Sequence, residues 1–275
     1  MILVVAAVAL FAALLMSGIL IRLYRSGASR DDAAGMVLLQ KHRGAAVAGN
    51  MPHVTVEPRP DGRLDLVVHN RGEAVIRLPG ILLPLTPAQR AWVERVKRYL
   101  LEQGAVRDIV QTDVPIYLPA VEAPLPELGM GNTLGYGKET FILLRRTFFD
   151  RNDIEELGGK ELRTLYHELA HAYLARRYGA AFGRLIAEAK DEEARKARME
   201  ELIEADEAFA WYAENVLADS WQYRQKAQEE PARRKRLAEI YRFKLAAHQE
   251  SYPQALYFWE PHWDHPRLQP WHANR

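Results

Sequence analysis

Two histidines and a glutamate stand at metal-binding spacing in "YHELAHAY", residues 166 to 173. On an α-helix, residues four apart lie on one face, so His167 and His171 can both point an imidazole nitrogen at one ion. Glu168 would lie about 100° further round the helix, beside the ion and within reach of a water molecule. The pattern predicts a hydrolytic metal site with Glu168 as the general base.

Coincidence explains this pattern poorly. With nine histidines and 36 acidic residues in 275 positions, a match to H-[DE]-x-x-H is expected by chance about 0.04 times. The competing interpretation is that both histidines are ordinary residues of a helix. The chain contains no cysteine, so histidine and carboxylate would have to hold the metal, and these ligands are typical of catalytic zinc. We therefore expect Zn²⁺ as the cofactor.

A catalytic zinc site needs a third protein ligand and an open fourth position. The six residues after His171, "AYLARR", contain no histidine, so the third ligand must come from another segment. In "LIEADEAFAWYAENV" three glutamates lie at spacings of three and seven, which places them on one face of a helix. Carboxylates on so apolar a helix are costly to bury unless something pairs with them. The candidates for the third ligand are Glu204, Glu207 and Glu214.

"HELAH" on a helix, after a glycine-rich edge strand and before a second helix with glutamate, resembles the gluzincin group of zinc metallopeptidases over residues 130 to 220. In that group the glutamate of the second helix is the third zinc ligand. "EAFA" at 207 to 210 is similar to the run around that ligand, so the resemblance favours Glu207. The ExxxD pattern of thermolysin-like members is absent, which leaves Asp206 and Asp219 as candidates for the carboxylate that supports the ligands.

The resemblance also implies an edge strand that pairs with an extended substrate and a donor that stabilises the oxyanion. "KETFILLR", residues 138 to 145, is the candidate strand, and its alternative interpretation is a buried core strand. The candidate donors lie near the C-terminus, where packed aromatic or surface histidine residues are the alternative: Tyr252, Tyr257, His262 and His265.

The segments around the motif predict an α+β domain. Turn residues in "PDG" and "NRG" separate "HVTVEP", "RLDLVVHN" and "EAVIRL", which predicts two or three short antiparallel strands. Thr86, Pro87 and Gln89 form a capping box that begins a helix ending before Gly104. In "GMGNTLGYGKETFILLRRTFF" glycine-rich turns are expected to lead into a strand at about 138 to 147. The helix with both histidines is expected to end at Gly179. Helical patterns follow over residues 181 to 219 and after Pro231.

The N-terminal segment predicts a membrane anchor. Residues 2 to 21, "ILVVAAVALFAALLMSGILI", carry no charge and would form a helix about 30 Å long, the thickness of a bilayer's hydrocarbon core. A cleaved signal peptide and a buried core helix are the alternatives. Basic residues follow this segment and none precedes it, so the bulk of the chain is expected to face the cytoplasm.

These patterns divide the chain into a transmembrane anchor at 1–21, a juxtamembrane linker at 22–50 and a zincin-like metallopeptidase domain with a helical C-terminal extension at 51–275. The balance of 37 basic and 36 acidic residues gives no reason to expect nucleic acid as a partner. We expect a single-pass membrane protein that hydrolyses peptide bonds in a protein or peptide substrate through a zinc-activated water. The alternative is a non-catalytic zincin-like scaffold that binds a protein partner through its charged helices.

Overall fold

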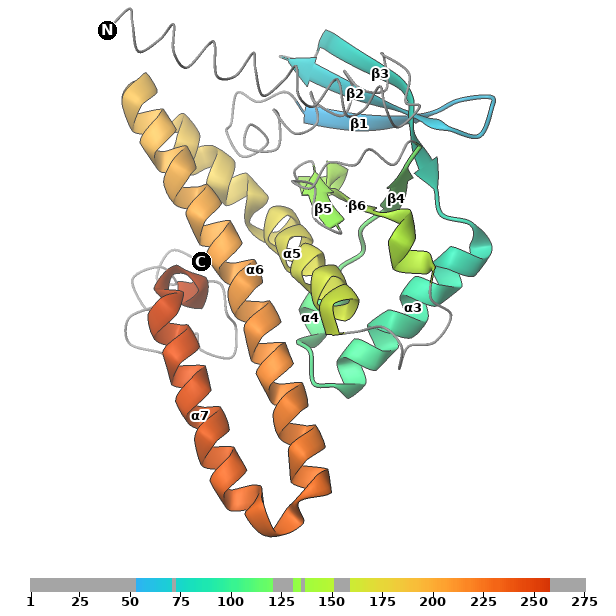
Figure 1. Cartoon of the computed structure of the whole chain (residues 1–275). Helices are drawn as coiled ribbons and strands as arrows, with labels where there is room; N and C mark the ends of the chain where they lie inside the picture. Colours follow the sequence, from blue (N-terminus) through green and yellow to red (C-terminus); the bar gives the residue numbers. More distant parts are fainter. Residues whose placement is uncertain (1–52, 71–72, 121–130, 135–136, 151–158, 258–275) are drawn as a thin grey trace, which may run out of the picture.

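The computed structural model describes residues 53–70, 73–120, 131–134, 137–150 and 159–257. In these residues the chain is a mixed α+β protein in which helices predominate and the strands form one curled sheet (Figure 1). Within this part of the chain no helix is both long enough and apolar enough to cross a bilayer. The predicted membrane anchor and the linker after it lie outside the described residues.

Among the described residues, six strands form one sheet in the order β1-β2-β3-β4-β6-β5. The three strands predicted from their turn residues are confirmed as an antiparallel set, and β4 extends it on the β3 side. β6 is parallel to β4 and antiparallel to β5, which forms the edge. The strand bounds are β1 (His53–Pro58), β2 (Leu64–Asn70), β3 (Glu73–Pro84), β4 (Ile116–Pro119), β5 (Gly131–Leu134) and β6 (Phe141–Leu144).

A buried carboxylate on β2 ties the first three strands together. Asp65 is only 6% exposed, and it accepts hydrogen bonds from Gly80 N at 2.8 Å, Arg77 Nη1 at 3.0 Å and Arg59 Nη1 at 3.2 Å. Burial by itself would raise the pKa of Asp65, but these donors favour the carboxylate and hold its pKa below the usual value. Because the pKa is lowered in the folded state, the stabilisation is present at neutral pH and is lost as the pH falls through the acidic range.

Replacing Asp65 with asparagine is expected to lower the thermal unfolding midpoint at pH 7 by roughly 3 to 5 °C, because the charge-assisted hydrogen bonds are lost. The difference from the wild type should shrink as the pH is lowered from 7 towards 3, because a carboxylate whose pKa is lowered by folding loses its stabilising effect as it becomes protonated. Circular dichroism melts at both pH values measure this, with Asp61→Asn as an exposed control. Equal midpoints for the Asp65 variant and the wild type at pH 7 would contradict this role.

The predicted capping box begins helix α3 (Pro87–Glu102). Thr86 Oγ1 accepts from Gln89 N at 3.2 Å, and Gln89 Oε1 accepts from Thr86 N at 2.9 Å. One face of α3 is buried through Trp92, Val93, Val96 and Leu100. The short helix α4 (Arg107–Val110) follows and contacts the histidine-bearing helix, and Val106 N donates to the buried Tyr166 Oη at 3.0 Å.

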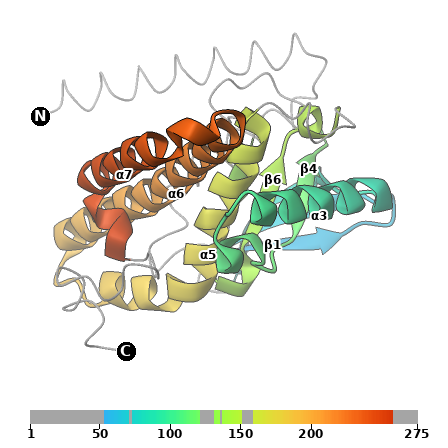
Figure 2. The same cartoon turned by 90° about the horizontal axis from the view of Figure 1, so that it is seen from below.

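Two long helices, α5 (Gly159–Ala187) and α6 (Glu192–Glu229), lie side by side and carry the predicted metal ligands (Figures 1 and 2). Asp191 caps α6 by accepting from Ala194 N at 2.8 Å. The rings of Tyr173 on α5 and Phe209 on α6 stack with centroids 6.0 Å apart. Apolar residues at helical spacing fill the interface: Leu165, Leu169, Ala172, Leu202, Ala205 and Ala213. The helix pair therefore contributes much of the core.

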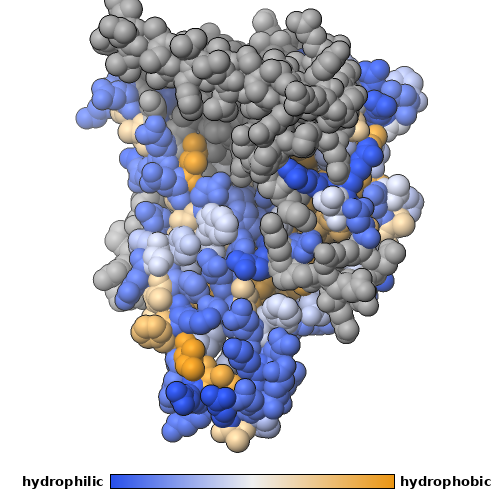
Figure 3. Space-filling view, in the orientation of Figure 1, coloured by the Kyte–Doolittle hydropathy of each residue, from blue (hydrophilic) through white to orange (hydrophobic). Residues whose placement is uncertain are grey.

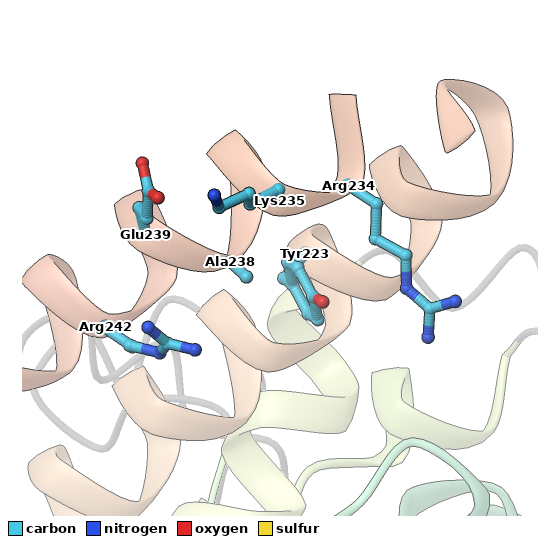
Figure 4. Close-up of a pocket in the computed structure, with 6 residues that line it drawn as sticks. All are labelled: Tyr223, Arg234, Lys235, Ala238, Glu239 and Arg242. Atoms are coloured by element: carbon cyan, nitrogen blue, oxygen red, sulfur yellow. The ribbon is translucent and has the colours of Figure 1, made fainter. Parts of the chain in front are cut away.

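Helix α7 (Arg234–Ser251) returns along the distal part of α6 after a 3₁₀ turn at Pro231–Arg233. Asp219 of α6 accepts from Lys244 Nζ at 2.6 Å and lies 2.8 Å from His248 Nε2. The surface over these two helices is mostly hydrophilic (Figure 3). A depression of about 480 Å³ lies between them (Figure 4), lined by Tyr223, Arg234, Lys235, Ala238, Glu239 and Arg242. It contains none of the predicted site residues.

The structure differs from three of the sequence predictions. Helix α5 passes through Gly179 to Ala187, because a glycine costs a helix interior only about 1 kcal/mol, which neighbouring packing can offset. The glycine-rich stretch predicted as turns contains β5. "KETFILLR" is not the edge strand: β6 lies between β4 and β5 with all four residues buried, which confirms the alternative of a core strand. Four consecutive apolar residues are typical of a strand buried on both faces.

Candidate metal centre

Three ligand atoms from α5 and α6 converge on one point. His167 Nε2 and His171 Nε2 are 3.1 Å apart, and Glu207 Oε2 lies 3.9 Å from the first and 3.7 Å from the second. Ligand atoms bound tetrahedrally to zinc at 2.0 to 2.2 Å lie about 3.3 to 3.6 Å from one another. The three side chains are thus close to a coordinating arrangement, and His167, His171 and Glu207 could together hold a metal ion.

We call His167, His171 and Glu207 the metal group. Its two histidines on α5 are buried, whereas its glutamate on α6 is accessible to solvent. His167 and His171 are 8% and 5% exposed, whereas the side chain of Glu207 is 40% exposed. Trp211, one turn after Glu207, is 44% exposed and meets the His167 ring edge-on with centroids 4.9 Å apart. Catalytic metal sites keep such an accessible side, whereas structural sites close the coordination shell with protein ligands.

In addition to Glu207, one further carboxylate lies close to the Nδ1 atom of each histidine. His171 Nδ1 is 2.9 Å from Asp206 Oδ2, and His167 Nδ1 is 3.0 Å from Glu214 Oε2. These are ion-pair contacts without a linear N–H···O alignment. Arg163 in turn donates to Glu214 Oε1 from Nε at 2.8 Å. A carboxylate beside Nδ1 electrostatically favours a proton on that nitrogen, which leaves the Nε2 lone pair for a metal.

The acidic surroundings favour the protonated form of His171. Burial by itself lowers the pKa of His171, but the carboxylates of Asp206, Glu168 and Glu207 outweigh it and raise the pKa to about 9. Burial raises the pKa of Glu214, but His167 and Arg163 favour its carboxylate and hold the pKa below the usual value. At pH 7 a metal must therefore displace a proton from His171 when it binds.

Glu168 is held between α5 and the edge strand β5. Its side chain is 4% exposed, and Thr133 Oγ1 lies 2.8 Å from Glu168 Oε2 and 2.8 Å from the Glu168 backbone oxygen. Gly131 packs so closely that a Cβ at this position would lie 2.8 Å from Glu168 Cγ. The predicted general base is thus adjacent to the first ligand, His167, and held by a hydroxyl group of the neighbouring strand.

The other residues considered from the sequence have different surroundings. Glu204 is exposed and lies outside the group, and Glu214 contacts His167 through Nδ1 rather than joining the three converging atoms. Asp206 does contact a histidine, whereas Asp219 pairs with Lys244 and His248 between α6 and α7. Tyr252 packs against the core. The side chain of Tyr257 and the residues His262 and His265 lie outside the described part.

Sequence reasoning missed the residues that surround Glu168 and Glu214. Thr133 and Gly131 stand in a stretch predicted as turns, and no spacing rule relates that stretch to α5. The small residues in "GNT", ahead of a strongly apolar run, were the only signal of a close approach between backbones. Arg163 is four residues before His167 and could have been placed near that face of α5 from helical spacing.

Replacing Asp206 with asparagine is expected to weaken zinc binding about 10- to 100-fold, because the histidine ligand loses its charged partner. Competition with a chromogenic chelator measures the dissociation constant of the full chain for zinc. Asp219→Asn is the matched control, since it removes another carboxylate of α6 that is remote from the ligands. An unchanged dissociation constant for Asp206→Asn would contradict the role assigned to this contact.

Comparison of the chain with protein-family models, curated proteins and solved structures gives no match.

Proposed function

We propose that this protein is a membrane-anchored, zinc-dependent metallopeptidase of the zincin type. The observation that carries the proposal is the convergence of His167 Nε2, His171 Nε2 and Glu207 Oε2, with the buried carboxylate of Glu168 next to them. Two imidazoles, one carboxylate and an open side are the donor set of a catalytic zinc site. Nitrogen donors favour zinc over magnesium or calcium, which prefer oxygen ligands.

Glu168 would carry the proton transfers of peptide hydrolysis. A zinc ion bound to the three ligands would lower the pKa of a water molecule to about 7 and polarise the substrate carbonyl. Glu168 takes the proton from the attacking water as the C–O bond forms, and it returns the proton to the amide nitrogen as the C–N bond breaks. The burial of Glu168 excludes competing solvent from its carboxylate.

A peptide substrate is favoured by the position of β5. This strand pairs with β6 on one side and, among the described residues, with no strand on the other. An extended peptide could add to such an edge through main-chain hydrogen bonds. Because Thr133 of β5 contacts Glu168, a peptide on this edge would lie close to the general base. The candidate strand for substrate pairing is therefore β5 and not "KETFILLR", the strand considered for this role from the sequence.

A non-catalytic scaffold is less consistent with this geometry. Burying a carboxylate is unfavourable even when it is hydrogen-bonded or paired with a charge, and a scaffold requires no carboxylate beside its metal. The side chain of Glu168 is nevertheless almost fully buried and accepts a hydrogen bond from Thr133. This arrangement favours an enzyme.

Hydrolysis of unfolded casein by the full chain in detergent tests the proposal. The zinc-loaded protein is expected to cleave casein, to lose this activity on treatment with 1,10-phenanthroline, and to regain it when zinc is returned after dialysis. The unfolded substrate removes any requirement for a particular folded partner. No cleavage by a chain shown to contain one zinc ion would count against the peptidase assignment.

The apolar segment at residues 2 to 21 would hold this enzyme at a bilayer, with the catalytic domain facing the cytoplasm. Deletion of residues 1–21 is expected to move the protein from the membrane fraction to the supernatant after carbonate extraction. Retention of the shortened chain in the membrane fraction would contradict the anchor.

A further inference from the structure

One contact of the site is not explained by metal binding. Thr133 Oγ1 lies 2.8 Å from Glu168 Oε2 and 2.8 Å from Glu168 O, whereas the group that converges on the metal point is His167, His171 and Glu207. A hydroxyl carries one proton, so it can donate to the carboxylate while remaining close to the backbone oxygen. The contact therefore joins the edge strand to the general base and not to a ligand.

The close packing of β5 against α5 makes this contact specific. At Gly131 any side chain would place a carbon atom 2.8 Å from Glu168 Cγ and 3.1 Å from Leu144 Cδ2, so a larger residue would displace the glutamate or the strand. Thr133 is two residues further along the same strand and thus on the same face. Gly131 allows β5 to lie close to α5, and at this short distance the Thr133 hydroxyl reaches the Glu168 carboxylate.

We propose that Thr133 is a positioning residue that fixes the orientation of the Glu168 carboxylate, with Gly131 providing the space for this contact. The inference rests on the proposed function. A glutamate side chain has three rotatable bonds, so without the Thr133 contact the Glu168 carboxylate could adopt several orientations relative to the attacking water. With Oε2 held by the Thr133 hydroxyl, Oε1 is the oxygen presented to the attacking water. The proton then moves to one defined atom.

Thr133→Ala and Thr133→Ser test this role, because they differ from each other only in the hydroxyl group. For casein hydrolysis by the zinc-loaded full chain, Thr133→Ala is expected to lower kcat about 10- to 100-fold with KM changed less than about twofold. Thr133→Ser is expected to keep kcat within about threefold of the wild type. Zinc affinity should be unchanged in both, since Thr133 contacts no ligand.

Two further measurements separate positioning from stability. Thr112→Val is the matched control. Thr112 is a buried threonine whose hydroxyl donates to Asp108 O at 2.9 Å and not to a residue of the site. Its unfolding midpoint should fall about as far as that of Thr133→Ala, with kcat unchanged. A crystal structure of zinc-loaded Thr133→Ala should show the Glu168 carboxylate rotated or in two conformers, and that of Thr133→Ser should not.

The outcomes distinguish this inference from the proposed function. If the zinc-loaded wild type does not hydrolyse casein, the proposed function fails, and a fixed Glu168 in the Thr133→Ala crystal structure would still overturn the positioning role. If the wild type is active but the alanine and serine variants have equal kcat values, the hydroxyl has no such role. Parallel loss of zinc and stability in both variants would assign Thr133 a structural role only.

Discussion

Replacing Glu168 with glutamine is expected to reduce casein hydrolysis by about 10²- to 10⁴-fold while the chain keeps one zinc ion. The amide has nearly the shape of the carboxylate, and its oxygen can still accept from Thr133, so the site should remain folded. It cannot take a proton from water, which is the contribution of a general base. Turnover with casein and zinc content by elemental analysis are measured on the same preparation.

The control for this variant is Glu161→Gln, a glutamate two turns earlier on α5, outside the metal group. It should retain both zinc and activity. Loss of zinc from Glu168→Gln would mean that Glu168 is itself a ligand. Full activity of Glu168→Gln would mean that another group takes the proton, and the mechanism given above would be wrong.

Removing any one of the three converging side chains is expected to abolish stable zinc binding. His167→Ala and His171→Ala each delete a nitrogen donor from a site with three protein ligands, and Glu207→Gln replaces an anionic donor by a neutral one. We expect zinc affinity to fall by at least about 100-fold in each case, more than for the loss of a supporting contact. Titration against a chromogenic chelator measures the three dissociation constants.

Glu204→Gln is the matched control for Glu207→Gln, because Glu204 lies on the same helix three residues earlier and is exposed. Its dissociation constant should equal that of the wild type. If Glu207→Gln binds zinc as tightly as the wild type and Glu214→Gln does not, the third ligand is Glu214, and its contact with His167 Nδ1 would have to rearrange when metal binds.

The candidate ligands could be predicted from the sequence to the extent that helical spacing determines which residues share a helix face. His167 and His171 share a face of α5 because they are four residues apart, whatever the fold around them. The spacing of Glu204, Glu207 and Glu214 identified the helix that meets them, but three candidates remained. Packing distinguishes them: Glu207 reaches the Nε2 atoms, Glu214 the outer nitrogen of His167, and Glu204 is exposed.

The strand that holds Glu168 could not be predicted, because its sequence carries little strand signal. Glycine weakens a strand in isolation, and "GNTL" becomes β5 by pairing with β6 while packing against α5. Likewise, Gly179 does not end α5, because a glycine inside a helix costs only about 1 kcal/mol. In both places the local sequence signal is too weak to determine the structure.

The most direct test of the metal centre is an anomalous difference map, collected at the zinc absorption edge, from crystals of the zinc-loaded chain. We expect one strong peak about 2.0 to 2.2 Å from His167 Nε2, His171 Nε2 and a carboxylate oxygen of Glu207. Such a peak with Glu168 beside it would establish the site from which hydrolysis is argued. The absence of a peak there, or a single peak elsewhere in the chain, would show that "YHELAHAY" is an ordinary helix and that the proposed enzyme does not exist.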